Sequence, residues 1–170
     1  MNPQPSGDLE AEQKQKRKRS ARTLIGWREW ASFPDLGVNR INAKIDTGAK
    51  SSAIHAFRIR EIELDGAAGV EFFLHPRQRR KTPEIFCRTP LIDKRTIRSS
   101  NGQEEERFVI RTRLSMGKKI WKIDLTLTNR DAMGFRLLIG RDALRRKFNI
   151  DPGASYLLGE IAETSSGKHT

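Results

Sequence analysis

The stretch AKIDTGAKSSAIHA, residues 43–56, joins a strand-like pattern to a turn that carries an aspartate. In residues 41–46 apolar and polar side chains alternate, which predicts a half-buried strand that ends on Asp46. Gly48 opens backbone angles that other residues avoid, and the Thr47 hydroxyl can hydrogen-bond the nearby backbone. Asp-Thr-Gly also occurs in ordinary turns. Asp46 is therefore either a turn carboxylate or half of a catalytic pair.

Lys-Ile-Asp occurs a second time, at residues 122–124, and allows an internal comparison. There the chain continues as LTLTN, in which apolar residues still alternate with polar ones. This pattern places Asp124 on the polar face of an uninterrupted strand, where a structural role is expected. At Asp46 the strand stops instead.

Two later features of the sequence make a catalytic role for the Asp-Thr-Gly motif more specific. The segment RLLIGRDAL, residues 136–144, runs from large apolar residues through Gly140 into a segment, GRDALRRKF (140–148), with helical spacing. Between the two motifs, Asn101-Gly102 is a strong hairpin signal, and Gly102 lies 38 residues before Gly140. The order and spacing of the three features are more specific than any one of them.

The rest of the chain is mostly strand-like. EIEL and VEFFL flank Asp65-Gly66 and predict a second hairpin, while RFVIRTRL and IWKIDLTLTN predict two strands joined at SMGKK. HPRQRRKTP is expected to be a loop. The expected class is all-β, a small closed or sandwich-like barrel with one short helix.

Charge and composition set the outer limits. We expect residues 1–22 and 161–170 to be disordered tails around one domain, 23–160, because the basic run at 14–22 repels itself. The formal net charge is +12, which suits acidic partners such as nucleic acid, ribosomes or acidic peptides. A purely charge-driven nucleic-acid binder is disfavoured, because Trp27, Trp30 and Trp121 lie in apolar stretches and are expected in the core. No apolar run suggests a membrane span or a signal peptide, so a cytoplasmic protein without a membrane partner is expected.

Together the three features resemble the retropepsins, the single-lobe aspartic proteases. IGWREW, KIDTGAKSSAIHAF, HPRQRR, LTLTNRDAMGFRLLIGRDAL and DPGASYL narrow the resemblance to small bacterial retropepsin-like proteins, often labelled ATP-dependent zinc proteases. The resemblance covers roughly residues 24–158. It implies a flap hairpin over a cleft and a homodimer in which each chain supplies one catalytic aspartate. Some relatives are encoded beside an ATP-grasp ligase that adds glutamates to a ribosomal protein.

The resemblance assigns roles to three groups of residues. The implied catalytic residues are Asp46, Thr47 and Gly48; the substrate-binding and flap residues are Ala49, Lys50, Ser100, Asn101 and Gly102; the residues supporting the active site are Leu138, Ile139, Gly140, Arg141 and Asp142. Viral retropepsins carry an aspartate where Lys50 stands, so its usual pair with the arginine corresponding to Arg141 is lost, and Asp142 is a candidate partner for Lys50. Residues 57–97 form a long segment between the catalytic loop and the flap that viral retropepsins lack, and the sequence does not assign it a role.

The zinc and ATP parts of the family label have no support in the residues. There is no His-Glu-x-x-His helix and no Gly-rich phosphate loop, and the candidate ligands His55, His75 and Cys87 lack metal-site spacing. A single cysteine excludes an internal disulfide. We therefore expect no metal and no cofactor.

The sequence leaves two function classes open. The first is an aspartic endopeptidase acting on peptides or proteins, including acidic or glutamylated tails. The second is a non-catalytic retropepsin-fold module that regulates or binds a partner, for example the glutamate ligase or a ribosomal protein, because a fold does not establish chemistry. Cleavage that is lost when Asp46 alone is changed separates the two.

Overall fold

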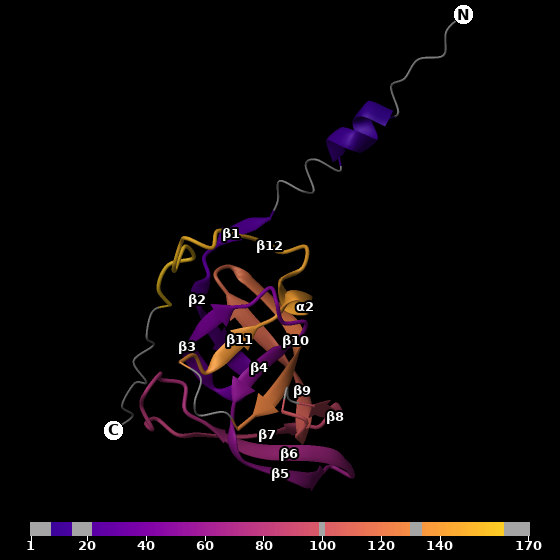
Figure 1. The fold of residues 1–170 in the computed structure, drawn as a ribbon, viewed down its shortest axis with the longest axis vertical. Helices are drawn as coiled ribbons and strands as arrows, with labels where there is room; N and C mark the ends of the chain where they lie inside the picture. Colours follow the sequence, from indigo (N-terminus) through magenta and orange to yellow (C-terminus); the bar gives the residue numbers. More distant parts are fainter. Residues whose placement is uncertain (1–7, 15–21, 99–100, 130–133, 162–170) are drawn as a thin grey trace, which may run out of the picture.

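The structure, a computed structural model, describes residues 8–14, 22–98, 101–129 and 134–161. Its centre is a closed six-stranded β-barrel in the order β10-β4-β11-β3-β2-β9, and pairing of β9 with β10 closes the ring (Figure 1). The barrel strands are β2 (Arg28–Phe33), β3 (Val38–Ile45), β4 (Ser52–His55), β9 (Glu104–Met116), β10 (Lys119–Thr128) and β11 (Leu137–Ile139). The expected all-β closed barrel is confirmed.

Smaller elements surround the barrel. A three-stranded antiparallel sheet of β5 (Phe57–Leu64), β6 (Ala67–Leu74) and β7 (Ile85–Pro90) contains the predicted Asp65-Gly66 hairpin. One further strand, β8 (Asp93–Arg98), extends the barrel sheet beside β9. The barrel is also flanked by a parallel pair, β1 (Thr23–Ile25) with β12 (Phe148–Ile150), and by two short helices, η1 (Pro34–Leu36) and α2 (Arg141–Leu144). HPRQRRKTP is a loop, as predicted.

The alternation read from the sequence matches the burial of the strands. Ile41, Ala43 and Ile45 on β3 are buried, and Ile123, Leu125 and Leu127 on β10 are buried as well. The inner face of the β5–β7 sheet supplies Val70, Phe72, Leu74 and Cys87 to the same hydrophobic cluster. The segment 57–97 is therefore built onto the barrel core rather than forming a core of its own.

Two sequence expectations are corrected. The helix expected over residues 140–148 ends at Leu144, because Arg145 leaves helical angles and Arg146 adopts φ +67°. The backbone then pairs Phe148 with Thr23 in the parallel ladder of β12 and β1. The three tryptophans are half-buried rather than fully buried, and of the three Trp121 packs against the hydrophobic core. Trp30, for example, stacks on Tyr156 with ring centroids 5.3 Å apart, and the Arg40 guanidinium lies 3.8 Å from its ring centroid.

The chain ends are partly outside the described residues. Residues 8–14 form a short helix with every residue exposed, and the disorder expected for residues 1–22 and 161–170 stays a prediction. No helix among the described residues is long and apolar enough to cross a membrane.

Glu29 is a fully buried carboxylate that ties the C-terminal segment to β2. Its Oε1 accepts hydrogen bonds from the backbone N–H groups of Gly26 and Leu157, both at 2.8 Å, and its Oε2 accepts one from Leu158 at 3.3 Å. Residues 155–159 are one of two terminal segments that the sequence offers as candidates for tying the chains of a dimer together. Through Leu157 and Leu158 this segment is anchored within its own chain. Its part in a dimer stays a prediction.

Replacing Glu29 by Ala is expected to lower the free energy of unfolding by about 3 kcal/mol, because three backbone donors lose a charged acceptor in the interior. Urea denaturation measures the loss. Glu63→Ala, on an exposed position of β5, is the matched control and should stay within about 0.5 kcal/mol of wild type. Equal midpoints for the two variants would show that the Glu29 contacts are energetically unimportant.

Candidate active site

Asp46 stands where β3 ends, directly beside β11. The two strands run parallel, with Ile45 opposite Ile139, and the Asp46 backbone N–H donates to the Ile139 carbonyl at 2.9 Å. The apolar-apolar-Gly segment therefore passes beside the Asp-Thr-Gly loop, as the resemblance implied. Leu138 and Ile139 support the loop through this ladder, and Leu138 also pairs with Ala53 of β4.

The Asp46 carboxylate is oriented by its own loop. Its Oδ1 accepts hydrogen bonds from the backbone N–H groups of Gly48, at 2.9 Å, and Ala49, at 3.2 Å. Within the described part of the chain, Oδ2 accepts no hydrogen bond. Asp46 is half-buried, whereas Thr47 and Gly48 are exposed. The loop thus holds one carboxylate oxygen and leaves the other without a hydrogen-bond donor among the described residues.

Gly140 lets a second loop pass close to the first. A Cβ atom built on Gly140 would lie 2.4 Å from the Ser51 carbonyl oxygen and 2.9 Å from that of Lys50, so only glycine fits there. The Gly140 N–H donates to the Ser52 Oγ at 3.0 Å. This close approach brings the start of α2 against residues 49–52.

Arg141 clamps the Asp46 loop from the same side. Its backbone N–H donates to the Ala49 carbonyl at 2.8 Å, and its guanidinium Nη1 donates to the carbonyls of Thr47 at 2.9 Å and Gly48 at 3.1 Å. In this chain the arginine holds loop carbonyls. The carboxylate it meets in viral retropepsins is absent here.

Asp142 and Lys50 contact each other only through the backbone. The Asp142 N–H donates to the Lys50 carbonyl at 3.0 Å, whereas the Asp142 carboxylate lies 3.8 Å from the Arg145 guanidinium. The suggested ion pair between Lys50 and Asp142 is therefore wrong, because the i,i+3 arginine on the same turn takes the carboxylate. Lys50 is exposed and forms no ion pair with any residue that the structure describes.

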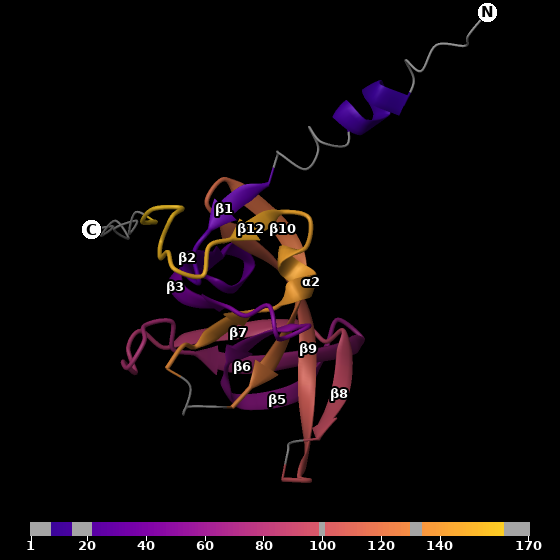
Figure 2. The same cartoon turned by 45° about the horizontal axis from the view of Figure 1, so that its top comes forward.

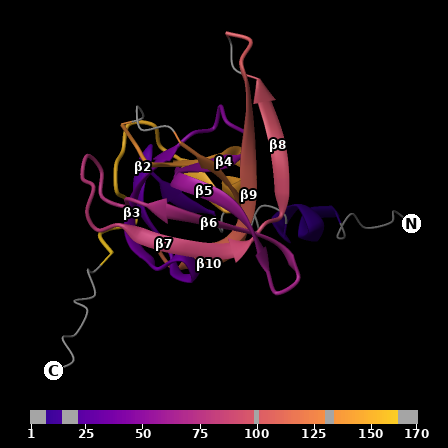
Figure 3. The ribbon, with the colours of Figure 1, turned by 90° about the horizontal axis from the view of Figure 1, so that it is seen from below.

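The predicted flap hairpin is present. Antiparallel pairing of β8 and β9 runs from Asp93 opposite Val109 to Arg98 opposite Glu104, and the hairpin extends beyond the barrel in Figures 2 and 3. Asn101 and Gly102 lie in its connection, with Gly102 at φ +81°, and Ser100 lies outside the described residues. The connection spans residues 99–103, longer than the two-residue turn that Asn-Gly favours.

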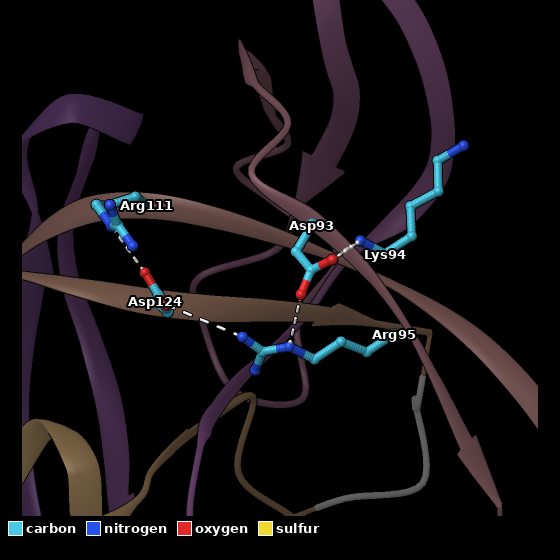
Figure 4. A network of polar contacts seen from close by, with 5 residues as sticks. All are labelled: Asp93, Lys94, Arg95, Arg111 and Asp124. Atoms are coloured by element: carbon cyan, nitrogen blue, oxygen red, sulfur yellow. Dashed lines mark hydrogen bonds and ion pairs between the residues drawn. The ribbon is translucent and has the colours of Figure 1, made fainter.

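A cavity of about 410 Å³ lies between residues 50–52, which follow the Asp46 loop, and strands β8, β9 and β10, and residues 46–49 are not part of its lining. Its lining contains four cations and two carboxylates: Lys50, Ser51, Ser52, Arg95, Arg111, Lys122, Ile123, Asp124, Asp142 and Ala143. Figure 4 shows how the Asp124 carboxylate is held, with Arg111 Nε at 2.8 Å and Arg95 Nη2 at 4.0 Å. Arg95 also bonds Asp93, which accepts the Lys94 backbone N–H. The cavity is therefore positive. Asp124, for which a structural role was expected, and Asp93 are both engaged in ion pairs.

The three residues considered as metal ligands do not gather at one site. His55 and His75 both lie near the Phe57 ring, with ring centroids 6.3 Å and 4.3 Å from it. Cys87 is buried in the core, where desolvation raises the pKa of its thiol to about 12 and keeps it protonated. Among the described residues no three His, Cys, Asp or Glu side chains gather closely enough to hold a metal ion.

The closed barrel, the hairpin of β8 and β9 and the Asp46 loop agree with what comparisons with known proteins show. The model of the RimB-like family, described as retropepsin-like aspartic endopeptidase RimB, matches residues 24–160. The chain belongs to this family. A crystal structure of a Legionella pneumophila protein of unknown function has the same fold, with a TM-score of 0.67 and 29% identity over 80% of this chain and 98% of that one.

Curated relatives of this RimB-like chain are much longer than it is. Proteins named "Probable alpha-L-glutamate ligase" are 49% identical over 148 residues in Desulfotalea psychrophila and 45% identical over 137 residues in Shewanella pealeana. These matches cover 87% and 81% of this chain but only 32% and 30% of the relatives. The chain thus spans about a third of the curated relatives that it matches.

Sequence reasoning missed the cations of the cavity. Arg95, Arg111 and Lys122 come from three different strands, and only the register of β8, β9 and β10 brings them together. Ser52 was also missed. The signal available was weak, because an isolated arginine on an exposed strand face is usually only solvated.

Proposed function

We propose that this RimB-like chain is a homodimeric aspartic endopeptidase that hydrolyses acidic or glutamylated protein tails. The observation that carries the proposal is the Asp46 carboxylate, which two backbone N–H groups orient through Oδ1 on a loop clamped by Arg141, while Oδ2 accepts no hydrogen bond from the described residues. Such a loop supplies one carboxylate. Peptide hydrolysis without a metal requires an acid and a base in the same step, so two loops must meet.

The two Asp46 carboxylates of a C2 dimer would share one proton, because two like charges so close cannot easily both ionise. The ionised carboxylate takes a proton from water, and the water oxygen bonds to the carbonyl carbon of the substrate. The protonated carboxyl donates its proton to the carbonyl oxygen. The tetrahedral intermediate then breaks the C–N bond as a proton passes to the leaving amine.

The neighbouring residues have supporting roles in this proposal. The Thr47 hydroxyls join the two loops at the axis, and Gly48 and Ala49 let the substrate backbone approach. The hairpin around Asn101 and Gly102 closes over the bound peptide and excludes water. Ser100 belongs to this flap by the same reasoning.

Positive charge beside the loop supports an acidic substrate. The cavity that begins four residues after Asp46 carries Lys50, Arg95, Arg111 and Lys122, and its two carboxylates already have arginine partners. The Lys50 amine, without an ion-pair partner in the described chain, is available to a substrate carboxylate. Relatives named as glutamate ligases contain a region like this chain, so glutamate-rich peptides and the ligase itself are the first substrates and partners to test.

Lys50→Gln is expected to lower kcat/KM for a glutamate-rich peptide roughly three- to ten-fold, as for the loss of about 1 kcal/mol from one solvent-exposed contact. Cleavage of a neutral peptide with the same scissile bond should change little. Lys118→Gln, in the exposed β9–β10 turn, is the matched control for net charge. If kcat/KM falls equally for both peptides, or equally in both variants, Lys50 does not recognise the acidic substrate.

A non-catalytic module of a glutamate ligase is the second candidate. The observation that favours it is that the matching region makes up only about a third of relatives named as ligases, so it also occurs as part of larger chains. A digest of a peptide library by wild type separates the candidates: cleavage supports the peptidase, and binding without cleavage supports the module. A ribosomal partner and a cytoplasmic location remain predictions.

A further inference from the structure

The outer face of the β5–β7 sheet carries a row of three aromatic rings. Phe57, Phe73 and Phe86 are directly opposite one another on adjacent strands, and the ring centroids are 5.7 Å and 5.1 Å apart. Their neighbours Phe72 and Cys87 point the other way, into the core. Phe86 is 51% exposed. The row is therefore a surface feature, and Figure 3 views the molecule from the side of these three strands.

Cationic and imidazole side chains are interleaved with the rings. The Arg58 guanidinium lies 5.8 Å from the Phe57 centroid and 5.5 Å from that of Phe73, and the Arg88 guanidinium lies 5.8 Å from that of Phe86. The His75 ring extends the row, 4.3 Å from Phe57. The sequence analysis disfavoured a nucleic-acid binder because the three tryptophans were expected in the core. Pairing of β5, β6 and β7 supplies surface aromatic rings of a different kind.

A cavity of about 610 Å³ opens at the His75 end of the row. That volume is within the range of pockets that hold small organic molecules. Its lining mixes aromatic, cationic and amide groups: His55, Phe57, Arg58, His75, Arg79, Lys81, Glu84, Asn129 and Arg136. The cavity is separate from the one beside Asp46, with which it shares no residue.

The face has a clear excess of positive charge. Its two carboxylates are already engaged: Glu71 accepts from Arg60 and Arg88, and Glu84 lies 3.8 Å from Arg58. The guanidiniums beside Glu71 hold the pKa of that carboxyl below its ordinary value, so it stays ionised and engaged at neutral pH. Among the residues that the structure describes, the row and the cavity carry six cations, namely Arg58, Arg60, Arg79, Lys81, Arg88 and Arg136.

We infer that this face binds single-stranded nucleic acid. Unpaired bases stack on Phe86 and Phe73, one base enters the cavity against Phe57 and His75, and the phosphates lie along the arginines and Lys81. Aromatic rings on adjacent strands of an antiparallel sheet, framed by cations, are the general platform for unpaired bases. An acidic peptide would satisfy the charge but not the rings, and an apolar protein segment would satisfy the rings but not the charge. The inference is independent of the proposed peptidase.

The test measures the fluorescence anisotropy of a fluorescein-labelled oligouridine of about twelve nucleotides as the full chain is added. The same length of duplex RNA serves as a second probe, and poly-glutamate serves as an unlabelled competitor. Phe86→Ala should weaken oligouridine binding roughly 5- to 100-fold, the usual effect of losing one stacked base. Phe86→Leu, which keeps apolar area but loses the flat ring, should weaken it in the same direction. Arg79→Gln should reduce both affinity and its salt dependence.

Ile120→Ala is the matched control, since Ile120 is 60% exposed on β10 and lies on neither the row nor the cavity. It should bind like wild type, and circular dichroism melts check that every variant folds. Tighter binding of oligouridine than of duplex, lost in both Phe86 variants, supports the inference. The inference is overturned if both Phe86 variants bind oligouridine like wild type. It is also overturned if duplex RNA binds as tightly as oligouridine and poly-glutamate displaces the probe, because charge attraction alone then explains the binding. Absence of oligouridine binding also overturns the inference.

Discussion

Asp46→Asn should abolish peptide cleavage while leaving the fold unchanged. An asparagine side-chain oxygen can still accept the hydrogen bonds that Gly48 and Ala49 donate to Oδ1, so the loop keeps its shape. The amide cannot act as a general base or hold the shared proton. The expected fall in kcat is at least about 10²- to 10⁴-fold, the usual contribution of a positioned proton-transfer group.

The measurement is hydrolysis of a defined glutamate-rich peptide in mildly acidic buffer, with thermal melts of both proteins. Asp65→Asn is the matched control, because Asp65 lies in the β5–β6 turn at φ +50°, a conformation that asparagine tolerates. It should cleave like wild type. If Asp46→Asn retains wild-type turnover, Asp46 is not catalytic, and a function as a non-catalytic module is favoured.

Gly140→Ala is expected to damage stability and activity together. The added Cβ would lie 2.4 Å from the Ser51 carbonyl oxygen, so the backbone of one loop must move. That movement strains the bonds that Gly140 and Arg141 make to residues 47–52. We expect a loss of about 1–3 kcal/mol in the free energy of unfolding, as for other overpacked sites. Because the same bonds position Asp46, activity should fall more than about ten-fold even where the variant is folded.

Gly134→Ala provides the comparison, since a Cβ there would meet nothing within 4 Å. Denaturant unfolding and peptide hydrolysis, measured on the same preparations, separate the two effects. A Gly140→Ala protein that unfolds and cleaves like Gly134→Ala would mean that the close approach of the two loops is not required.

The features that could be predicted from the sequence rest on local periodicity and turn chemistry. Alternation along residues 41–46 correctly predicted which side chains of β3 are buried, and Asp65-Gly66 correctly predicted its hairpin. The helix boundary could not be predicted, because residues 145–148 leave the helix only to pair with Thr23 far away in the chain. Local patterns carry no information about such a partner.

The same limit explains what was missed at the surface. Phe57, Phe73 and Phe86 are each unremarkable in the sequence, and only strand register aligns them. The cations Arg95, Arg111 and Lys122 meet for the same reason. Conversely, the Asp46 loop was predictable because a compact motif and its partner segment, Leu138–Gly140, both have local signatures. The suggested pairing of Lys50 with Asp142 failed because Arg145 lies closer on the same turn.

The central claim is that the active site combines one Asp46 carboxylate from each of two chains. A mixing experiment tests this claim most directly. Wild type at fixed concentration is unfolded and refolded together with increasing amounts of Asp46→Asn, so that chains pair at random, and cleavage is compared with wild type refolded alone. At a nine-fold excess of the variant, only about one tenth of wild-type chains pair with another wild-type chain in a C2 dimer. Activity per wild-type chain should then fall about ten-fold, in proportion to the expected dimer fractions. Activity per wild-type chain that stays constant at every ratio would contradict a site shared between two chains.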